Sequence, residues 1–283
     1  MTKQKFFPED FYHVDNTMSM EKIRSAEKSN DFVVGKVLLW NPVELIFKVD
    51  LGNNIHGYLP LNKISVYPPF KKGGQIDTSV VYGLVGKTIC ACITSISEDG
   101  EIYLSRKRSM KKVFKYLQKE NFLSENVSFT CTLTEFCDSG AYFDIGLGLT
   151  AFMHISEFSR VRIKSSKMFP DFYKGVHVQS VLTQLTEKYS RYSIRISYKY
   201  AFDNLVETKQ LHVDDVIKAR LFDTVDSNCS GYYAHINPLT PAIMDTPNFW
   251  NPSCIEYGGE VLVRVHSISF SKVKLRFEDF VTT

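Results

Sequence analysis

The chain has 283 residues and a mass of 32.5 kDa, with 44% hydrophobic and 23% charged residues. This is an ordinary globular composition, and it excludes a disordered tail, a collagen-like repeat and a disulfide-dense secreted scaffold. The formal net charge of +3 is too small to indicate a class of partner. Aromatic residues make up 13% of the chain, which favours β-rich structure, exposed stacking surfaces, or both.

Targeting and metal signals are absent from the sequence. Residues 1–10, MTKQKFFPED, lack the apolar stretch of a secretory signal, and no run reaches the roughly 18–20 apolar residues of a membrane span. The six cysteines form no Cys-x-x-Cys pair, and no two histidines have zinc-ligand spacing. We therefore expect a cytoplasmic protein with reduced thiols, no membrane contact, no metal and no cofactor.

The first predicted element is an amphipathic helix over 16–28, inside a lead-in segment of residues 1–31. A β-rich block, 32–108, follows. Its strand-like runs alternate apolar and polar residues and lie at 32–40, 46–51, 57–62, 86–96 and 101–107.

A linker, 109–124, comes next, with a predicted helix over 110–121 that has valine, phenylalanine and leucine on one face and lysines opposite. The second block is 125–199. A second linker, 200–211, shows a weaker helical pattern over 200–210, and the third block is 212–283. Both later blocks repeat the five-run pattern of the first, at 126–136, 141–145, 151–156, 175–185 and 192–199, and at 215–225, 232–236, 241–246, 258–268 and 273–279.

Three similar blocks in one chain indicate an internal repeat. Five short strands in about 70–77 residues fit a small closed barrel better than a sandwich. The predicted fold class is therefore all-β with short helical connectors, built from three tandem five-stranded barrels of the OB-fold type.

Several motifs resemble one known repeat. They are GYLP at 57–60, SVYPP at 65–69, LSRK at 104–107, GAYFDI at 140–145 and MHIS at 153–156. Together they resemble tandem S1-type RNA-binding domains, the OB-fold repeat of small-subunit ribosomal protein S1. The three-block length is similar to short three-domain relatives of that protein from Gram-positive bacteria. The resemblance implies RNA binding, with contacts on Tyr142 and His154.

Strand alternation in the second block predicts one exposed face. Asp144 is expected to face solvent, because a carboxylate is costly to bury, so Phe143 and Ile145 should face the core. The outward side chains then form an aromatic platform with a cation beside it, the arrangement that single-strand binders use for stacking and phosphate contact. These candidate RNA-binding residues are Tyr142, Phe152, His154 and Arg195.

The first and third blocks carry fewer candidates. The first offers Lys48 and Tyr58, together with Arg106 and Lys107, which begin a basic run toward the lysines of the first linker. That run is also what a solvated helix face would show. In the third block we expect four side chains to point outward: Tyr233, His235, Lys274 and Arg276. Of these, Tyr233 and Arg276 are the RNA-binding candidates.

Charge separates the blocks. Residues 32–199 hold 22 Lys and Arg against 14 Asp and Glu, a net +8, whereas residues 212–283 hold 6 against 9, a net −3. A nucleic-acid site is therefore expected on the first two barrels. The third barrel suits protein contact or a structural end piece.

The sequence shows no phosphate-binding loop, no zinc-protease motif and no nucleophile elbow, so no catalytic residue is expected. We expect a monomeric, non-catalytic binder of single-stranded RNA (mRNA or rRNA), active in translation or RNA metabolism, with the small ribosomal subunit as a candidate partner. Two alternatives stay open. One is a protein-interaction scaffold, favoured by Ser139, which stands where the family often has an aromatic residue. The other is binding of single-stranded DNA, since only contacts to the 2′-hydroxyl separate the two nucleic acids.

Overall fold

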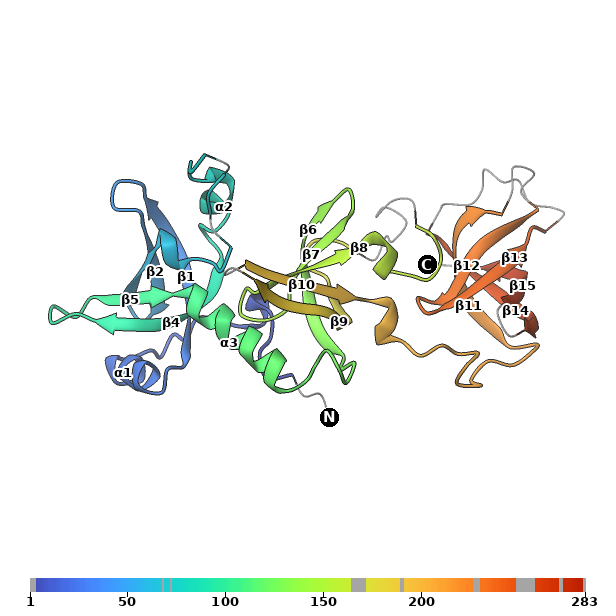
Figure 1. Cartoon of the computed structure of the whole chain (residues 1–283), viewed down its shortest axis with the longest axis horizontal. Helices are drawn as coiled ribbons and strands as arrows, with labels where there is room; N and C mark the ends of the chain where they lie inside the picture. Colours follow the sequence, from blue (N-terminus) through green and yellow to red (C-terminus); the bar gives the residue numbers. More distant parts are fainter. Residues whose placement is uncertain are drawn as a thin grey trace. The chain divides into compact units, whose positions relative to one another are not determined.

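The computed structural model describes residues 4–67, 69–71, 73–163, 172–188, 191–225, 230–247, 258–269 and 272–281. Within them the chain forms fifteen strands and a few short helices, and the strands close into three five-stranded barrels (Figure 1). The predicted fold class is confirmed: the chain is mostly β and is consistent with three tandem OB-like domains.

Two compact units make up the chain. The first comprises residues 1–132, 144–151 and 184–194, and the second comprises residues 133–143, 152–183 and 195–283. The boundary passes through the strands of the second barrel. The contacts described below each lie within one unit.

The first barrel has the strand order of an OB fold. β3 and β5 run parallel, and β4 pairs back onto β1 to close the ring. Its strands are β1 (Phe32–Asn41), β2 (Ile46–Gly52), β3 (Ile55–Pro60), β4 (Thr88–Ile96) and β5 (Ile102–Ser105), in the spatial order β1-β2-β3-β5-β4.

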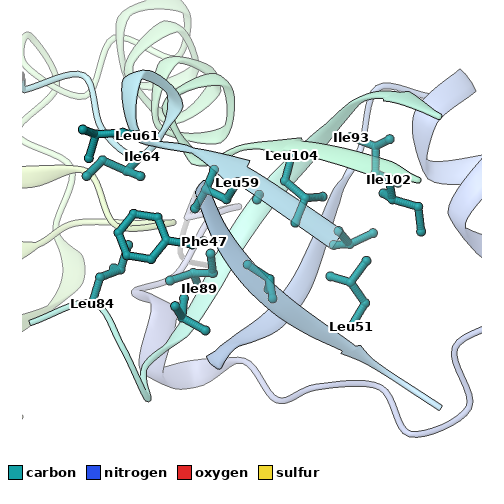
Figure 2. Close-up of a cluster of buried hydrophobic side chains, with 14 of the residues drawn as sticks. Phe47, Leu51, Leu59, Leu61, Ile64, Leu84, Ile89, Ile93, Ile102 and Leu104 are labelled. Atoms are coloured by element: carbon teal, nitrogen blue, oxygen red, sulfur yellow. The ribbon is translucent and has the colours of Figure 1, made fainter. Parts of the chain in front are cut away.

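Alternate residues of these strands fill the barrel. In β2, Phe47, Val49 and Leu51 are buried, whereas Ile46 and Lys48, at alternate positions, are half-exposed. Figure 2 shows Phe47 and Leu51 of β2 pointing into the same core as Leu59 and Leu104. This strand therefore has one face in the core and one toward solvent, as the two-residue period of a strand dictates.

The second and third barrels repeat this topology. The second contains β6 (Phe129–Cys137), β7 (Gly140–Asp144), β8 (Thr150–His154), β9 (His177–Lys188) and β10 (Arg191–Ser197), with β8 and β10 parallel. The third contains β11 (Val216–Thr224), β12 (Gly231–Asn237), β13 (Thr240–Asp245), β14 (Glu260–Ser269) and β15 (Lys272–Phe280), with β13 and β15 parallel.

Three α-helices accompany the barrels in the part of the chain that the structure describes. α1 (Met20–Lys28) and α3 (Arg106–Lys119) confirm the two stronger helix predictions, and each begins at a serine whose side chain accepts a backbone N–H of the first turn. α2 (Thr78–Tyr82) lies in the irregular insert of the first barrel and was not predicted. Among the described residues, no helix is long and apolar enough to cross a membrane.

The helix predicted over 200–210 is wrong. The structure has a single 3-10 turn, Lys199–Ala201, followed by hydrogen-bonded turns. The Asn204 side chain accepts the backbone N–H of Val206, and the N–H of Leu205 donates to the Thr240 hydroxyl. Because asparagine competes for nearby backbone groups in this way, it favours a turn over helix here.

Asp144 corrects a second expectation. It was expected to face solvent, yet only 6% of it is exposed, and Phe143 and Ile145 on either side are also buried. β7 ends at Asp144, so strand alternation does not predict which way Ile145, the next residue, points. The carboxylate is covered by the N-terminal segment and accepts three backbone N–H groups, from Glu9, Gly146 and Gly148.

Candidate nucleic-acid interface

The middle barrel presents an aromatic pair, the exposed Tyr142 and the half-buried Phe152, next to a cation. The Tyr142 ring, 40% exposed on β7, lies 5.3 Å from the Phe152 ring on β8, with the planes tilted by 50°. On β10, the exposed Arg195 is the register partner of Phe152. Tyr142, Phe152 and Arg195 thus cross three adjacent strands, and we call them the middle row.

His154 extends the middle row along β8. Its ring lies 6.4 Å from that of Phe152 in an edge-on arrangement. Its Nδ1 accepts the backbone N–H of Ser156 and so caps the 3-10 helix η3 (Ile155–Glu157). Because Nδ1 is the acceptor, the neutral ring carries its proton on Nε2. The exposed histidine is thereby held in one orientation beside the aromatic pair.

Strand register identifies an equivalent row on the first barrel. Lys48 on β2 pairs with Tyr58 on β3, and Tyr58 pairs with Tyr103 on β5. The two tyrosine rings are 6.1 Å apart. We call Lys48, Tyr58 and Tyr103 the first row. Like the middle row, it combines two aromatic rings with one cation. Its cation lies on the second strand of the barrel, whereas the cation of the middle row lies on the fifth.

Tyr103 was missed by the sequence interpretation. The signal was present, because the closing strand alternates Ile102 and Leu104 inward around it. The phenol donates to Glu101 at 2.9 Å, and this bond to a carboxylate raises the Tyr103 pKa. The hydroxyl of Tyr103 is therefore occupied by Glu101.

The equivalent row on the third barrel has one aromatic ring instead of two. Register joins Tyr233 on β12 to Ile243 on β13, and Ile243 to Lys274 on β15. Tyr233 is exposed, as predicted, but isoleucine replaces the second ring. On the other side, Tyr233 pairs with Asp223 of β11, which puts a carboxylate on the same strip. Asp223, Tyr233, Ile243 and Lys274 are called the third row.

Arg276 is exposed, as predicted, but lies off the third row. Its Nη2 is 3.3 Å from Nε2 of His266, and its register partner on β14 is Arg264. Arg264 in turn forms an ion pair with Glu278 at 2.6 Å. Glu278 therefore offsets the charge of Arg264, the cation opposite Arg276.

Arg106 requires a correction. It was expected to begin an exposed basic run, but its side chain is only 15% exposed and makes a bidentate ion pair with Glu9, with both N–O distances 2.7 Å. The guanidinium also donates to the Ile64 carbonyl. Lys107, the next residue, is half-buried in the first turn of α3 and lies outside the rows.

His235 is likewise not exposed. It points out of its own barrel, as alternation predicts, but only 5% of it is accessible. The segment around Ser159 covers it, with Ser159 Oγ 2.9 Å from His235 Nδ1. Burial, and then the charge of Arg220, lower the His235 pKa to about 3, so the ring is neutral at physiological pH.

The described residues contain no cluster of three or more His, Cys, Asp or Glu side chains able to hold a metal. Cys90, Cys92 and Cys131 are buried, and burial raises the pKa of the first two. A buried, protonated thiol is a poor nucleophile. Cys229 and Cys254 lie outside the described residues.

Comparison with known proteins identifies no family. No protein-family model matches the chain, and no curated protein matches it. Among solved structures, a multidomain protein with nucleic acid binding domains from Streptococcus pneumoniae TIGR4 matches at 13% identity and a TM-score of 0.27. The match covers 88% of this chain and 73% of that one. A likeness this slight transfers neither fold nor function, so the functional assignment depends on the rows themselves.

Proposed function

We propose that this chain binds single-stranded RNA, without catalysis, through the middle row and the first row. The observation that carries the proposal is the middle row: the exposed Tyr142 ring and the half-buried Phe152 ring lie 5.3 Å apart on adjacent strands, with Arg195 in register beside them. Stacking of bases on aromatic rings and pairing of phosphates with cations are the two interactions that bind single strands.

The geometry supports affinity more than sequence discrimination. Each stacked base contributes roughly 1–3 kcal/mol whatever its identity, because every base has a π-face. His154 adds one fixed donor, Nε2–H, next to the Phe152 ring. We propose weak sequence preference and a salt dependence set by a few phosphate contacts.

The biological setting is part of the same proposal. The resemblance of the sequence motifs to S1-type repeats supports a cytoplasmic role in translation or RNA metabolism, with mRNA or rRNA as ligand and the small ribosomal subunit as a candidate partner. The net +8 charge of residues 32–199 supports RNA contact on the first two barrels.

A protein-interaction scaffold is the second candidate, and the third barrel favours it. Its row has one ring instead of two and carries Asp223, which repels phosphate. Residues 212–283 have a net charge of −3. A surface of this kind suits a protein partner better than a nucleic acid.

The test is fluorescence anisotropy with a labelled single-stranded RNA of about ten nucleotides, from about 50 to 200 mM salt. We expect Tyr142→Ala to weaken binding roughly fivefold to hundredfold, the loss of one stacked base. The slope of log affinity against log salt concentration reports the number of phosphate contacts. We expect Arg195→Gln to reduce the magnitude of this slope by about the value of one contact. His154→Asn keeps an acceptor for the η3 cap and isolates the loss of the imidazole.

Tyr173→Ala is the matched control, since Tyr173 is 64% exposed but lies outside the rows. It should leave binding unchanged. If wild type does not bind RNA at low salt, or if Tyr173→Ala weakens binding as much as Tyr142→Ala, the RNA proposal fails and the scaffold candidate takes its place. The same titration with DNA of equal sequence measures whether the 2′-hydroxyl contributes.

A further inference from the structure

We propose that residues 4–12 form a strap whose closure against the rest of the first unit depends on pH. A buried cluster of Glu9, Arg106 and Asp144, which we call the lock, holds the strap closed when the cluster carries one proton and releases the strap when that proton leaves. The proposal is independent of RNA binding. In Figure 1 the strap is part of the dark-blue start of the chain, beside α3.

The strap is fastened along its length within the first unit. The Gln4 side chain donates to the Thr130 carbonyl and accepts the Thr130 N–H, at 2.9 and 2.7 Å. The Phe7 carbonyl accepts the N–H of Leu147, and Asp10 accepts the Thr132 hydroxyl. The Phe6 ring packs edge-on against Tyr116 of α3, 5.4 Å away. The strap therefore bridges β6, α3 and the β7–β8 loop.

Glu9 is the centre of the lock. Its carboxylate makes the bidentate pair with Arg106, and Oε1 also accepts the Cys90 N–H of β4 at 3.0 Å. Its backbone N–H donates to Asp144 Oδ2 at 2.8 Å. The other Asp144 oxygen accepts the N–H groups of Gly146 and Gly148 at 2.8 and 3.1 Å.

The charges of the lock do not balance when both carboxyl groups are ionised. Two carboxylates then face one guanidinium, and the Glu9 and Arg106 side chains are only 12% and 15% exposed. A net buried charge is expensive, so one carboxyl group favours its protonated form. Arg106 donates two hydrogen bonds to the Glu9 carboxylate. Asp144 is therefore the carboxyl group that takes up the proton.

The electrostatics of Asp144 agree with that assignment. Burial, and next the charge of Glu9, raise the Asp144 pKa to about 7, against the opposing effect of its backbone N–H donors and Arg106. The lock is therefore neutral below about pH 7 and carries one excess negative charge above it.

The direction of the pH dependence follows by linkage. When the strap opens, Asp144 loses the cover and charge of Glu9, and its pKa falls toward the ordinary value of 3.8. The closed state binds the proton more tightly, so closure is favoured by acid. With these two pKa values, the closure constant should be about tenfold larger at pH 6 than at pH 8.

Two ionisable groups that face the lock stay neutral across this range. Cys90 on β4 and Tyr12 at the end of the strap both have a raised pKa, chiefly from burial, and stay neutral. Asp10 is held by Thr132. His13 is exposed just beyond the strap, and its substitution provides a control.

The test is amide hydrogen exchange from pH 6 to 8, corrected for the intrinsic exchange rate, on the full chain. Three amides report strap closure because their acceptors lie on the strap: Cys90, Thr130 and Leu147. We expect their protection to fall about tenfold between pH 6 and pH 8. The Val265 amide, bonded to Asp215 in the second unit, should not change.

Glu9→Gln removes the excess charge, so we expect the protection of the three amides in this variant to be independent of pH. In His13→Asn the protection should still depend on pH as in wild type. Asp144→Asn supplies a permanently neutral partner and should also flatten the profile, which keeps the proposal testable if Glu9→Gln folds poorly. A flat wild-type profile, or a pH dependence that survives in both lock variants, overturns the proposal.

Discussion

At the scale of single residues, burial decides what a polar side chain does, and His235 shows this most clearly. Its ring faces away from the barrel core, yet Ser159 and Phe222 enclose it, the latter with ring centroids 4.7 Å apart. Sequence alternation correctly predicts that it points outward but cannot predict the cover, because Ser159 is 76 residues away in the chain. A candidate binding residue thus becomes part of a packed contact.

The neutral state of His235 predicts an acid-sensitive stability. Burial lowers its pKa to about 3 from an ordinary 6.5, so the unfolded state binds more protons below pH 6.5. Stability from this group is complete above pH 6.5 and should fall by about 1.4 kcal/mol per pH unit below it, toward pH 3. Urea denaturation of wild type and His235→Gln at pH 7.5 and 5.5 measures this. Equal pH dependence in both proteins would contradict the prediction.

Tyr103 supports a prediction for the first row. Its ring supplies the stacking surface, whereas its hydroxyl is occupied by Glu101. We therefore expect Tyr103→Phe to bind RNA as wild type does and Tyr103→Ala to bind roughly fivefold to hundredfold more weakly. Anisotropy on a Tyr142→Ala background isolates the first row. Equal losses in the Phe and Ala variants would assign the effect to the hydroxyl instead of the ring.

At the scale of elements, strand register turns scattered residues into rows. Lys48, Tyr58 and Tyr103 are far apart in sequence but adjacent across β2, β3 and β5. The sequence predicts the strands and their inward faces, since alternation is a local property. It does not predict pairing partners, which is why Tyr103 was overlooked. Lys107 was included for its place in a basic run, but it lies in α3 and has no partner in a row.

Element ends are the other place where sequence and structure differ. α3 begins at Arg106, four residues before the predicted start, because Ser105 ends β5 and caps the helix at once. Arg106 therefore lies in the first turn, where a cation opposes the helix dipole and a carboxylate partner is favourable. That position explains why its guanidinium is paired with Glu9 instead of facing solvent.

The third row predicts a gain of function. Asp223 repels phosphate and Ile243 lacks a π-face, so this row should contribute little to RNA binding. Replacing both residues, Asp223→Asn with Ile243→Phe, recreates the ring pair of the middle row next to Lys274. We expect the double variant of the full chain to bind RNA more tightly than wild type by several-fold, with stacking as the cause.

Ile243→Leu with Asp223→Asn is the matched control, because it removes the charge without adding a ring. If it gains as much affinity as the phenylalanine variant, repulsion by Asp223 is the whole effect. If neither variant gains affinity, the third barrel's face does not meet RNA in the bound state, which favours a protein partner for that barrel.

At the scale of the whole molecule, the sequence predicts three barrels but not what joins the N-terminal segment to them. The repeat is visible because each block carries the same local pattern. The lock is not, because Glu9 lies 97 residues from Arg106 and 135 from Asp144. Residues 4–12 of the lead-in segment, for which no element was predicted, contact β4, β6, α3 and the β7–β8 loop.

Gly148 provides a test of the lock that does not alter its charges. A Cβ at this position would collide with the Arg106 guanidinium, and the backbone φ of +77° is one that only glycine adopts readily. We therefore expect Gly148→Ala to displace Arg106 from Glu9 and to reduce protection of the Cys90, Thr130 and Leu147 amides at both pH 6 and pH 8. Gly175→Ala, at a similar φ of +93° but with open space around it, controls for backbone strain alone. Wild-type protection in Gly148→Ala would show that the strap closes without the lock, whereas loss confined to that variant would identify the guanidinium as the part that fastens it.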